Sequence, residues 1–354
     1  MAYATIDDPA KHFDPVLTTG TGNTQEISTL SFQPDFIWGK RRDASGHQTL
    51  FDSVRGVTKG LEANQTGAEF TSTDYYDSFD NDGFTIAAGA SGAGNGSSQT
   101  AVNYCWKAGT AFSNDASSTS VGTIDSSGSI NTTAGFSIQI YTGSNANSNI
   151  GSIAHGLGAA PDTIWVKDRD ATSDWLIFHT KMGNNKILEF NDYAAAGTDA
   201  NAWNNTAPSS TVFTVGDNSY TNANGRKFVA WLFTSIKGYS RFGTYQGNGN
   251  SEGPYVHCGF RPAYVIIKSS SHAVNWKAFD NKRDPHNKAS GTTFNLNENG
   301  AEDDNSAYKV HLNTNGFKLR NTNSNLNSDG YTYTYYAWAE SPFVNSNGIP
   351  TNAR

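Results

Sequence analysis

The chain has 354 residues, only 16% of them charged, with a formal net charge of −7. Its charged fraction is well below the roughly 25% of ordinary soluble domains, while Gly, Asn, Ser, Thr and Tyr are abundant. Gly and Asn are poor helix residues, so this composition predicts an all-β protein of short strands and tight turns. The negative charge argues against a nucleic-acid partner, and the lack of a long apolar run argues against membrane insertion.

The cysteine count and the first ten residues indicate in which cellular compartment the chain is made. Only Cys105 and Cys258 occur, so a disulfide framework and paired-cysteine metal sites are excluded. The opening MAYATIDDPA has no basic stretch followed by an apolar one, so we expect no secretory signal and synthesis in a reducing cytoplasm.

The predicted elements follow one pattern three times along the chain. A strand ending on Gly and a Gly/Asn/Ser loop come first, and then a Pro motif that reads QPDFIWGK, APDTIWVK and RPAYVIIK in turn. The run after each proline is apolar at consecutive positions, which predicts a strand buried on both faces. A Phe strand, an L-x-x-N strand, a Gly-Phe strand and a closing aromatic strand complete each β-sandwich-like unit.

The spacing within this pattern is regular. In every copy a Lys lies six residues after the Pro, and a Phe lies eleven residues after the Lys. The positions that fix the register are Pro34, Pro161, Pro262, Phe51, Phe178, Phe279, Trp106, Phe233 and Trp338. This register predicts three tandem homologous units of about 100 residues, each burying these anchors in its own core.

The register also sets the expected boundaries. Unit 1 spans residues 1–108, unit 2 spans 135–237 and unit 3 spans 238–354. Residues 109–134 are rich in Ser, Thr and Gly, and we interpret them as an extended spacer, with a short strand near Val121–Ile124 as an open alternative. Units 2 and 3 follow one another with almost no spacer, so we expect them to pack together.

Some aromatic residues recur at the same position of the repeated pattern, which we call a column, and these columns allow two interpretations. Trp175 and Trp276 share one column, in which unit 1 has Gln48. Recurrence in a column favours a core position, and the alternative is an exposed ring that stacks on sugars. Tyr331, Tyr333 and Tyr335 alternate with Thr, which places their rings on one face of a strand.

The sequence offers no recognisable reaction centre. Its histidines lack metal-ligand spacing, and neither a nucleophile elbow nor a phosphate loop occurs. Asp77, Asp80 and Asp82 resemble a calcium loop, but Phe79 interrupts the pattern, and we favour a turn. We therefore predict no catalytic residue, no bound metal and no cofactor.

Two carboxylate pairs remain as an open alternative for catalysis. Glu69 with Asp52, or Glu302 with Asp280, could supply a general acid and base. A chain with 32 acidic residues offers such pairs by chance, so this signal is weak.

Several segments resemble a known family. The Pro motif, FDSVRGVTK at 51–59, YCWKAG at 104–109 and residues 301–343 are similar to a repeat-domain family of unknown function. That family occurs in tail-fibre and other virion structural proteins of marine tailed bacteriophages. The resemblance covers essentially the whole chain and implies a virion component, assembled in the host cytoplasm with other phage structural proteins. It supplies no catalytic residues.

The resemblance and the composition together predict a tail-fibre or spike component that takes part in host attachment. We expect a homotrimer, because phage fibres are generally trimeric and exposed aromatic side chains need burial. Unit 1 would lie on the particle-anchoring side, and unit 3 would bind a host surface glycan or protein. The candidate binding residues are Trp276, Tyr331, Tyr333, Asn321, Asn323 and Asn325.

Other interpretations stay open at this point. The chain could be a capsid- or particle-decorating protein without a receptor role, or a tail-borne glycan depolymerase. The asparagines between 321 and 327 could form only a solvated hairpin loop.

Overall fold

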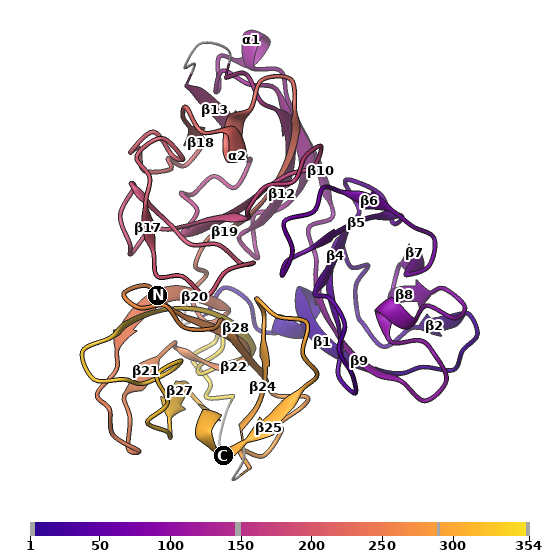
Figure 1. Cartoon of the computed structure of the whole chain (residues 1–354), viewed down its shortest axis with the longest axis vertical. Coiled ribbons are helices and arrows are strands. Elements are labelled where there is room, and N and C mark those ends of the chain that lie inside the picture. Colours follow the sequence, from indigo (N-terminus) through magenta and orange to yellow (C-terminus); the bar gives the residue numbers. More distant parts are fainter. Residues whose placement is uncertain (1–3, 146–149, 289–290, 352–354) are drawn as a thin grey trace.

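The computed structural model describes residues 4–145, 150–288 and 291–351 and confirms the all-β class, with 43% strand and 5% helix. The chain traces three lobes in succession around a common centre, from indigo through magenta to yellow (Figure 1). We call residues 13–106 lobe 1, residues 110–233 lobe 2 and residues 240–342 lobe 3. No helix in the described ranges is long and apolar enough to cross a bilayer.

Lobe 1 consists of a six-stranded and a three-stranded sheet, ordered β1-β9-β3-β4-β5-β6 and β2-β8-β7. The short helix η1 (Pro9–Lys11) precedes it, and η2 (Ser91–Ala93) lies before its last strand. Its strands are β1 (Phe13–Thr19), β2 (Gln25–Ile27), β3 (Phe36–Arg41), β4 (Thr49–Asp52), β5 (Lys59–Glu62), β6 (Phe70–Thr71), β7 (Tyr76–Asp80), β8 (Gly83–Ile86) and β9 (Thr100–Trp106).

Lobe 2 has a six-stranded sheet ordered β10-β11-β12-β19-β14-β15, with the separate pairs β13-β18 and β16-β17. Two single-turn helices, α1 (Ala116–Thr119) and α2 (Ser219–Asn222), lie in its connections. Its strands are β10 (Thr110–Asn114), β11 (Ser126–Asn131), β12 (Phe136–Thr142), β13 (Gly151–Ala154), β14 (Thr163–Asp168), β15 (Leu176–His179), β16 (Lys186–Ile187), β17 (Gly197–Thr198), β18 (Val212–Val215) and β19 (Lys227–Phe233).

Lobe 3 has sheets ordered β20-β28-β22-β23-β24-β25 and β21-β27-β26, with the short helix η3 (Ser306–Tyr308). Its strands are β20 (Ser240–Gln246), β21 (Tyr255–His257), β22 (Phe260–Ser269), β23 (Lys277–Asp280), β24 (Gly291–Asn295), β25 (Asp303–Asn305), β26 (Val310–Asn313), β27 (Gly316–Leu319) and β28 (Thr332–Pro342).

The motif prolines lie at the entrances of buried strands. Pro34 and Pro161 precede β3 and β14 by two residues, whereas Pro262 lies within β22. The pairing of β22 with β28 shifts register on either side of Pro262. Since proline lacks the N–H that a regular ladder needs, a bulge at this point is the expected accommodation.

The segment interpreted as a spacer, residues 109–134, is structured, and that interpretation is wrong. It forms β10 and β11, which pair with each other and extend the lobe 2 sheet beyond β12. Ladder hydrogen bonds come from the backbone, so Ser, Thr and Gly side chains can join a sheet edge without an apolar pattern.

Each lobe has its own core between its sheets, and the motif phenylalanines lie there. Phe51, Phe178 and Phe279 belong to three separate apolar clusters, one per lobe, and are between 0 and 4% exposed. The opposite face of each large sheet contributes to a fourth cluster, which all three lobes share.

The closing aromatic residues meet in this shared cluster rather than in separate cores. The rings of Trp106, Phe233 and Trp338 form a triangle with centroids 6.2, 5.3 and 5.4 Å apart. The register predicted burial within each unit, and the structure instead places these rings between the lobes. Side chains alternate between the faces of a strand, so Trp106 points away from the lobe 1 core that receives Cys105.

The motif lysines connect the lobes in a cycle. All three are at most 1% exposed, and each ammonium group donates to a backbone carbonyl of a neighbouring lobe. The donor–acceptor pairs are Lys40–Asn299 at 3.3 Å, Lys167–Thr66 at 3.1 Å and Lys268–Ala194 at 2.7 Å. Lobe 1 thus contacts lobe 3, lobe 2 contacts lobe 1, and lobe 3 contacts lobe 2.

Candidate functional site

Two of the aromatic residues expected to bind a ligand are buried. Trp276 and Tyr333 are both 0% exposed, so neither presents a ring face to solvent. Trp276 Nε1 donates to the carbonyl of Glu189 in lobe 2 at 2.8 Å, which makes this side chain an inter-lobe contact. The prediction of a stacking platform at these two positions is therefore wrong, and the core interpretation fits.

The same column has this role in every lobe. Its side chains donate N–H groups to the second residue of the L-x-x-N block of a neighbouring lobe. The pairs are Gln48–Asn295 at 3.3 Å, Trp175–Glu62 at 3.0 Å and Trp276–Glu189 at 2.8 Å. The amide of Gln48 replaces the indole and keeps the hydrogen bond, which explains why the column tolerates a non-aromatic residue.

The predicted asparagine ligands are engaged in internal hydrogen bonds. Asn321 Oδ1 accepts from Asn323 N, Asn323 Oδ1 accepts from Asn325 N, and Asn325 Oδ1 accepts from Asn275 N. Asn321 is also buried, at 5% exposed. These side chains form a chain of turns in the loop between β27 and β28. The alternative of a solvated hairpin loop does not hold either, because these two strands belong to different sheets and Asn321 and Asn327 are buried.

Tyr331 is half-buried and stacks on His272, with ring centroids 3.4 Å apart. Of the three aromatic candidate binding residues, it is the one whose ring stays partly open to solvent, although it packs against the lobe 3 apolar cluster.

A column of buried asparagines went unnoticed in the sequence. Asn95, Asn222 and Asn327 are each 0% exposed and lie eleven residues before the closing aromatic residue of their lobe. Each Oδ1 accepts a backbone N–H from the Gly loop that follows β1, β12 or β20, at 2.9–3.1 Å. That constant spacing was the available signal.

The carboxylate pairs considered for catalysis do come together, but an arginine lies between their members. Arg55 Nε pairs with Asp52 at 2.6 Å, and Arg55 Nη1 pairs with Glu69 at 3.2 Å. Arg169 of lobe 2 also forms a bidentate pair with Glu69, at 2.8 and 2.9 Å. Burial alone would raise the pKa of Glu69, but these two guanidinium groups lower it, so the carboxyl stays ionised.

The second pair follows the same plan at the junction of lobes 1 and 3. Arg283 pairs with Asp280 and Glu302, and Arg42 forms a bidentate pair with Glu302 at 2.8 and 3.1 Å. Both networks connect lobes, and neither leaves a carboxyl group for acid–base chemistry. At the junction of lobes 2 and 3, the repeat positions that hold the two carboxylates and two arginines of these networks are occupied instead by His179, Met182, Ala196 and Ser270.

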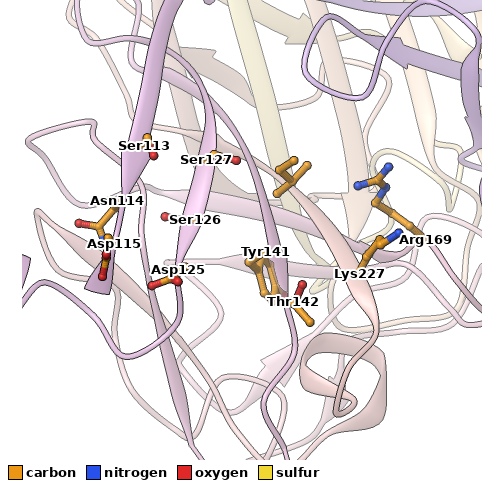
Figure 2. A pocket seen from close by; sticks show the side chains of 11 residues that line it. Ser113, Asn114, Asp115, Asp125, Ser126, Ser127, Tyr141, Thr142, Arg169 and Lys227 are labelled. Atoms are coloured by element: carbon orange, nitrogen blue, oxygen red, sulfur yellow. The ribbon is translucent and has the colours of Figure 1, made fainter. Parts of the chain in front are cut away.

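An open groove of about 500 Å³ lies on the lobe 2 sheet, over the face of β10, β11, β12 and β19 (Figure 2). Its floor carries the hydroxyl side chains of Ser113, Ser127 and Thr142, with Ile140 as an apolar element. Adjacent strands are about 4.8 Å apart, so the four strands give a groove roughly 14 Å across. The β10–β11 hairpin that forms one side belongs to lobe 2; the large sheets of lobes 1 and 3 instead extend at the opposite edge.

The two ends of the groove differ in charge. Asp115 and Asp125 lie at the hairpin end, and Arg169 and Lys227 at the β19 end (Figure 2). Asp115 caps α1, and Asp125 accepts from Ala116 N at 2.9 Å, so both acids are engaged locally. Lys227 is exposed, and within the described ranges its ammonium group forms no salt bridge. The groove therefore offers hydroxyl groups and one available cation.

Among the described residues, no group of three or more His, Cys, Asp or Glu side chains is placed to hold a metal ion. The acidic stretch around Asp80 is a β7–β8 hairpin, in which Asp80 pairs with Gly83 and accepts a hydrogen bond from Thr85. The sequence predicted a turn here rather than a calcium loop, and the turn is present between β7 and β8. The residues just before it form strand β7.

Residues 8–342 match a family model described as a domain of unknown function, DUF7483. The chain belongs to this family. The match runs across all three lobes, so the family domain is the whole assembly and not one unit of about 100 residues. No curated protein and no solved structure matches the chain.

Proposed function

We propose that this DUF7483 protein consists of three copies of one β unit and is a structural component of a bacteriophage virion. Support for the copies comes from the strand order, since each large sheet contains the same three adjacent strands: β1-β9-β3 in lobe 1, β12-β19-β14 in lobe 2 and β20-β28-β22 in lobe 3. The lysine, Trp/Gln and asparagine columns support it further, because each column makes the same hydrogen bond in every lobe.

The cyclic contacts suit a mechanical role. Buried lysines, the Trp/Gln column and two arginine–carboxylate networks join the lobes around a shared aromatic centre. Such a body holds its peripheral loops at fixed relative positions, as a tail-fibre or spike component must. The large apolar side chains that stay exposed in the described part of the chain are few and scattered.

This burial removes one argument for a homotrimer. The aromatic side chains that were expected to need burial between subunits are covered within one chain. Trimer formation stays a prediction that rests on the resemblance to phage fibres.

The groove of lobe 2 is the surface that we propose for host attachment. Its hydroxyl groups, the apolar Ile140 and the available ammonium of Lys227 suit a polyhydroxylated ligand with a negative charge, such as an acidic surface glycan. The main support for this assignment is the β10–β11 hairpin, which forms one side of the groove on lobe 2 and has no counterpart in the large sheets of lobes 1 and 3. Weak binding at one groove would gain strength from many copies on a particle.

Two experiments test the proposal. Immunogold labelling of particles that contain the chain should mark the tail, whereas labelling of the head would favour a decorating protein. Absence of the chain from purified particles would refute the virion assignment.

The groove is tested with an array of bacterial polysaccharides. Ser127→Trp, which fills the groove from an exposed position, and Lys227→Gln should each abolish binding of acidic glycans. Lys181→Gln, at an exposed lysine away from the groove, is the matched control and should bind normally. Equal binding by all three variants would refute the groove assignment.

A further inference from the structure

The chain contains six Asn-Gly pairs, and the structure gives them different surroundings. They begin at Asn95, Asn224, Asn248, Asn299, Asn315 and Asn347. In such a pair the main-chain nitrogen of the glycine can attack the side-chain amide of the asparagine, because glycine has no side chain to hinder the approach. The attacking nitrogen must be free, so its hydrogen bonds decide whether a given pair reacts.

Five of the six glycine nitrogens are engaged in the fold. The donor–acceptor pairs are Gly96 N–Gln99 Oε1 at 2.9 Å, Gly225 N–Gly143 O at 2.9 Å, Gly249 N–Asn327 O at 2.9 Å and Gly348 N–Asn345 O at 3.0 Å. Gly316 belongs to β27, which pairs with a strand on each side. Among the described residues, Gly300 N has no hydrogen-bond acceptor, and the side chain of Asn299 is exposed and forms no hydrogen bond.

Two donors from lobe 1 polarise the peptide group between Asn299 and Gly300. Its carbonyl oxygen accepts from Gly46 N at 2.8 Å and from the ammonium group of Lys40 at 3.3 Å. Burial lowers the pKa of this lysine to about 8, so the ammonium group is mostly charged at neutral pH. Donors on an amide oxygen stabilise the negative charge that develops there when the amide nitrogen loses its proton. The two donors therefore make Gly300 N a better nucleophile.

The fold builds the same pair of donors at the junction of lobes 1 and 2. There the carbonyl of Thr66 accepts from Ser173 N at 2.9 Å and from Lys167 at 3.1 Å. Thr66 and Asn299 each lie two residues after the Asn of their L-x-x-N block, as does Tyr193, whose carbonyl accepts from the third motif lysine at 3.0 Å. Of these three residues only Asn299 has a side-chain amide. A structural contact of the repeat thus activates an Asn-Gly pair at one junction.

We propose that Asn299 is a self-modifying residue, because Lys40 and Gly46 promote attack on its side chain by the next main-chain nitrogen. Water takes up the proton of Gly300 N, and the nitrogen forms a bond to Cγ of Asn299. The bond between Cγ and Nδ2 then breaks, and ammonia leaves with its electron pair and that proton. The product is a five-membered succinimide, and water opens it at either carbonyl to give aspartate or isoaspartate. The reaction takes up one water, releases one ammonia and involves no oxidation.

The modification changes the junction of lobes 1 and 3. In isoaspartate the main chain passes through the former side-chain carbon, so the backbone gains one methylene group. The oxygen that accepts from Lys40 then belongs to a free carboxylate, and a neutral inter-lobe acceptor becomes a charged one. Because ammonia is lost, the change is irreversible and accumulates with the age of the folded chain. The site lies apart from the lobe 2 groove and is independent of the virion assignment.

Incubation of the folded full-length chain in heavy-oxygen water, followed by peptide mass mapping, measures the reaction at each asparagine. Asn299 should deamidate about tenfold faster than Asn224, which is also exposed but whose glycine nitrogen is engaged. In urea the two donors are lost, and the rate at Asn299 should fall about tenfold. The rate at Asn224 should instead rise in urea, because unfolding frees its glycine nitrogen.

Lys40→Met separates activation from structural support. Loss of support alone frees the loop and speeds the reaction, whereas loss of the donor should slow deamidation of Asn299 about tenfold. Lys268→Met, which removes the equivalent buried lysine of another junction, is the matched control and should leave this rate unchanged. Equal rates at Asn299 and Asn224 in the folded chain, or a faster reaction of Asn299 in urea, would overturn the proposal. An unchanged or faster rate in folded Lys40→Met would overturn it as well.

Discussion

Stability should rise as the pH is raised above neutrality, because four lysines are buried and form no salt bridge within the described residues: Lys277 and the three motif lysines Lys40, Lys167 and Lys268. Burial lowers the pKa of Lys277 to about 8. Burial lowers the pKa of Lys40 and Lys167 to about 8 and that of Lys268 to about 7. In the unfolded chain a lysine titrates near 10.4. Between the folded and the unfolded pKa the unfolded chain binds more protons, so the free energy of unfolding increases with pH.

Lys268 provides the sharpest test, since its folded pKa is the lowest of the four. Below about pH 7 this lysine is charged in both states, and the cost of burying its charge is fully present. A difference of one bound proton changes the free energy of unfolding by about 1.4 kcal/mol per pH unit. Between about pH 7 and about pH 8.5, Lys268 alone should therefore add 1–2 kcal/mol to stability.

Other buried groups reduce the rise in stability above this window. Burial raises the pKa of Cys258 to about 12 and also raises the pKa of Cys105. Above about pH 8.5 the unfolded chain loses these two thiol protons while the folded chain keeps them, so they offset part of the rise in stability that the buried lysines cause up to about pH 10.

Urea unfolding at several pH values across the window measures the effect. The unmodified chain should gain stability, and Lys268→Met should gain about 1–2 kcal/mol less. Lys181→Met, which removes an exposed lysine of the same charge, should follow the unmodified chain. Equal pH dependence in the unmodified chain and Lys268→Met would refute the reasoning, whatever the stability of the variant at neutral pH.

Three further predictions concern packing, the ion pairs and acid. Trp338→Ala should lower the free energy of unfolding by about 3–5 kcal/mol in urea titrations, and a loss below about 1 kcal/mol would contradict the shared aromatic centre. Glu69→Ala should cost about 3 kcal/mol and speed amide exchange where lobes 1 and 2 meet, because it leaves the guanidinium groups of Arg55 and Arg169 partly unpaired. Burial lowers the pKa of His155 to about 4, so the unfolded chain binds more protons below about pH 6.5 and stability falls with acid. His155→Gln should lose less stability between about pH 6.5 and about pH 4 in thermal melts, and an unchanged acid profile would exclude this histidine as a cause.

The all-β class could be predicted from composition because it depends on local preferences. Gly, Asn and β-branched or aromatic residues restrict the backbone of each short segment, whatever it packs against. The apolar runs after Pro34 and Pro161 likewise predicted strands buried on both faces, and β3 and β14 are such strands.

The candidate binding residues could not be predicted in this way. Trp276 and Tyr333 are aromatic and recur with the pattern, but the sequence does not record which face of a strand another lobe covers. The two strands of the β10–β11 hairpin were not predicted for a related reason, since they pair through the backbone and show no alternation of apolar residues. The groove of lobe 2 leaves no signal in the sequence, because its walls come from segments far apart in the chain.

By itself, the sequence determined that the register positions leave water: the motif prolines and phenylalanines and the closing residues Trp106, Phe233 and Trp338 are all buried. Only the tertiary structure decided that these three rings meet one another across lobes, and that Lys40 donates to a carbonyl 259 residues away. The physical reason is that hydrophobic burial has no direction and is encoded residue by residue. A hydrogen bond or ring contact, in contrast, requires a partner at a set distance and angle, and only the folded chain supplies it.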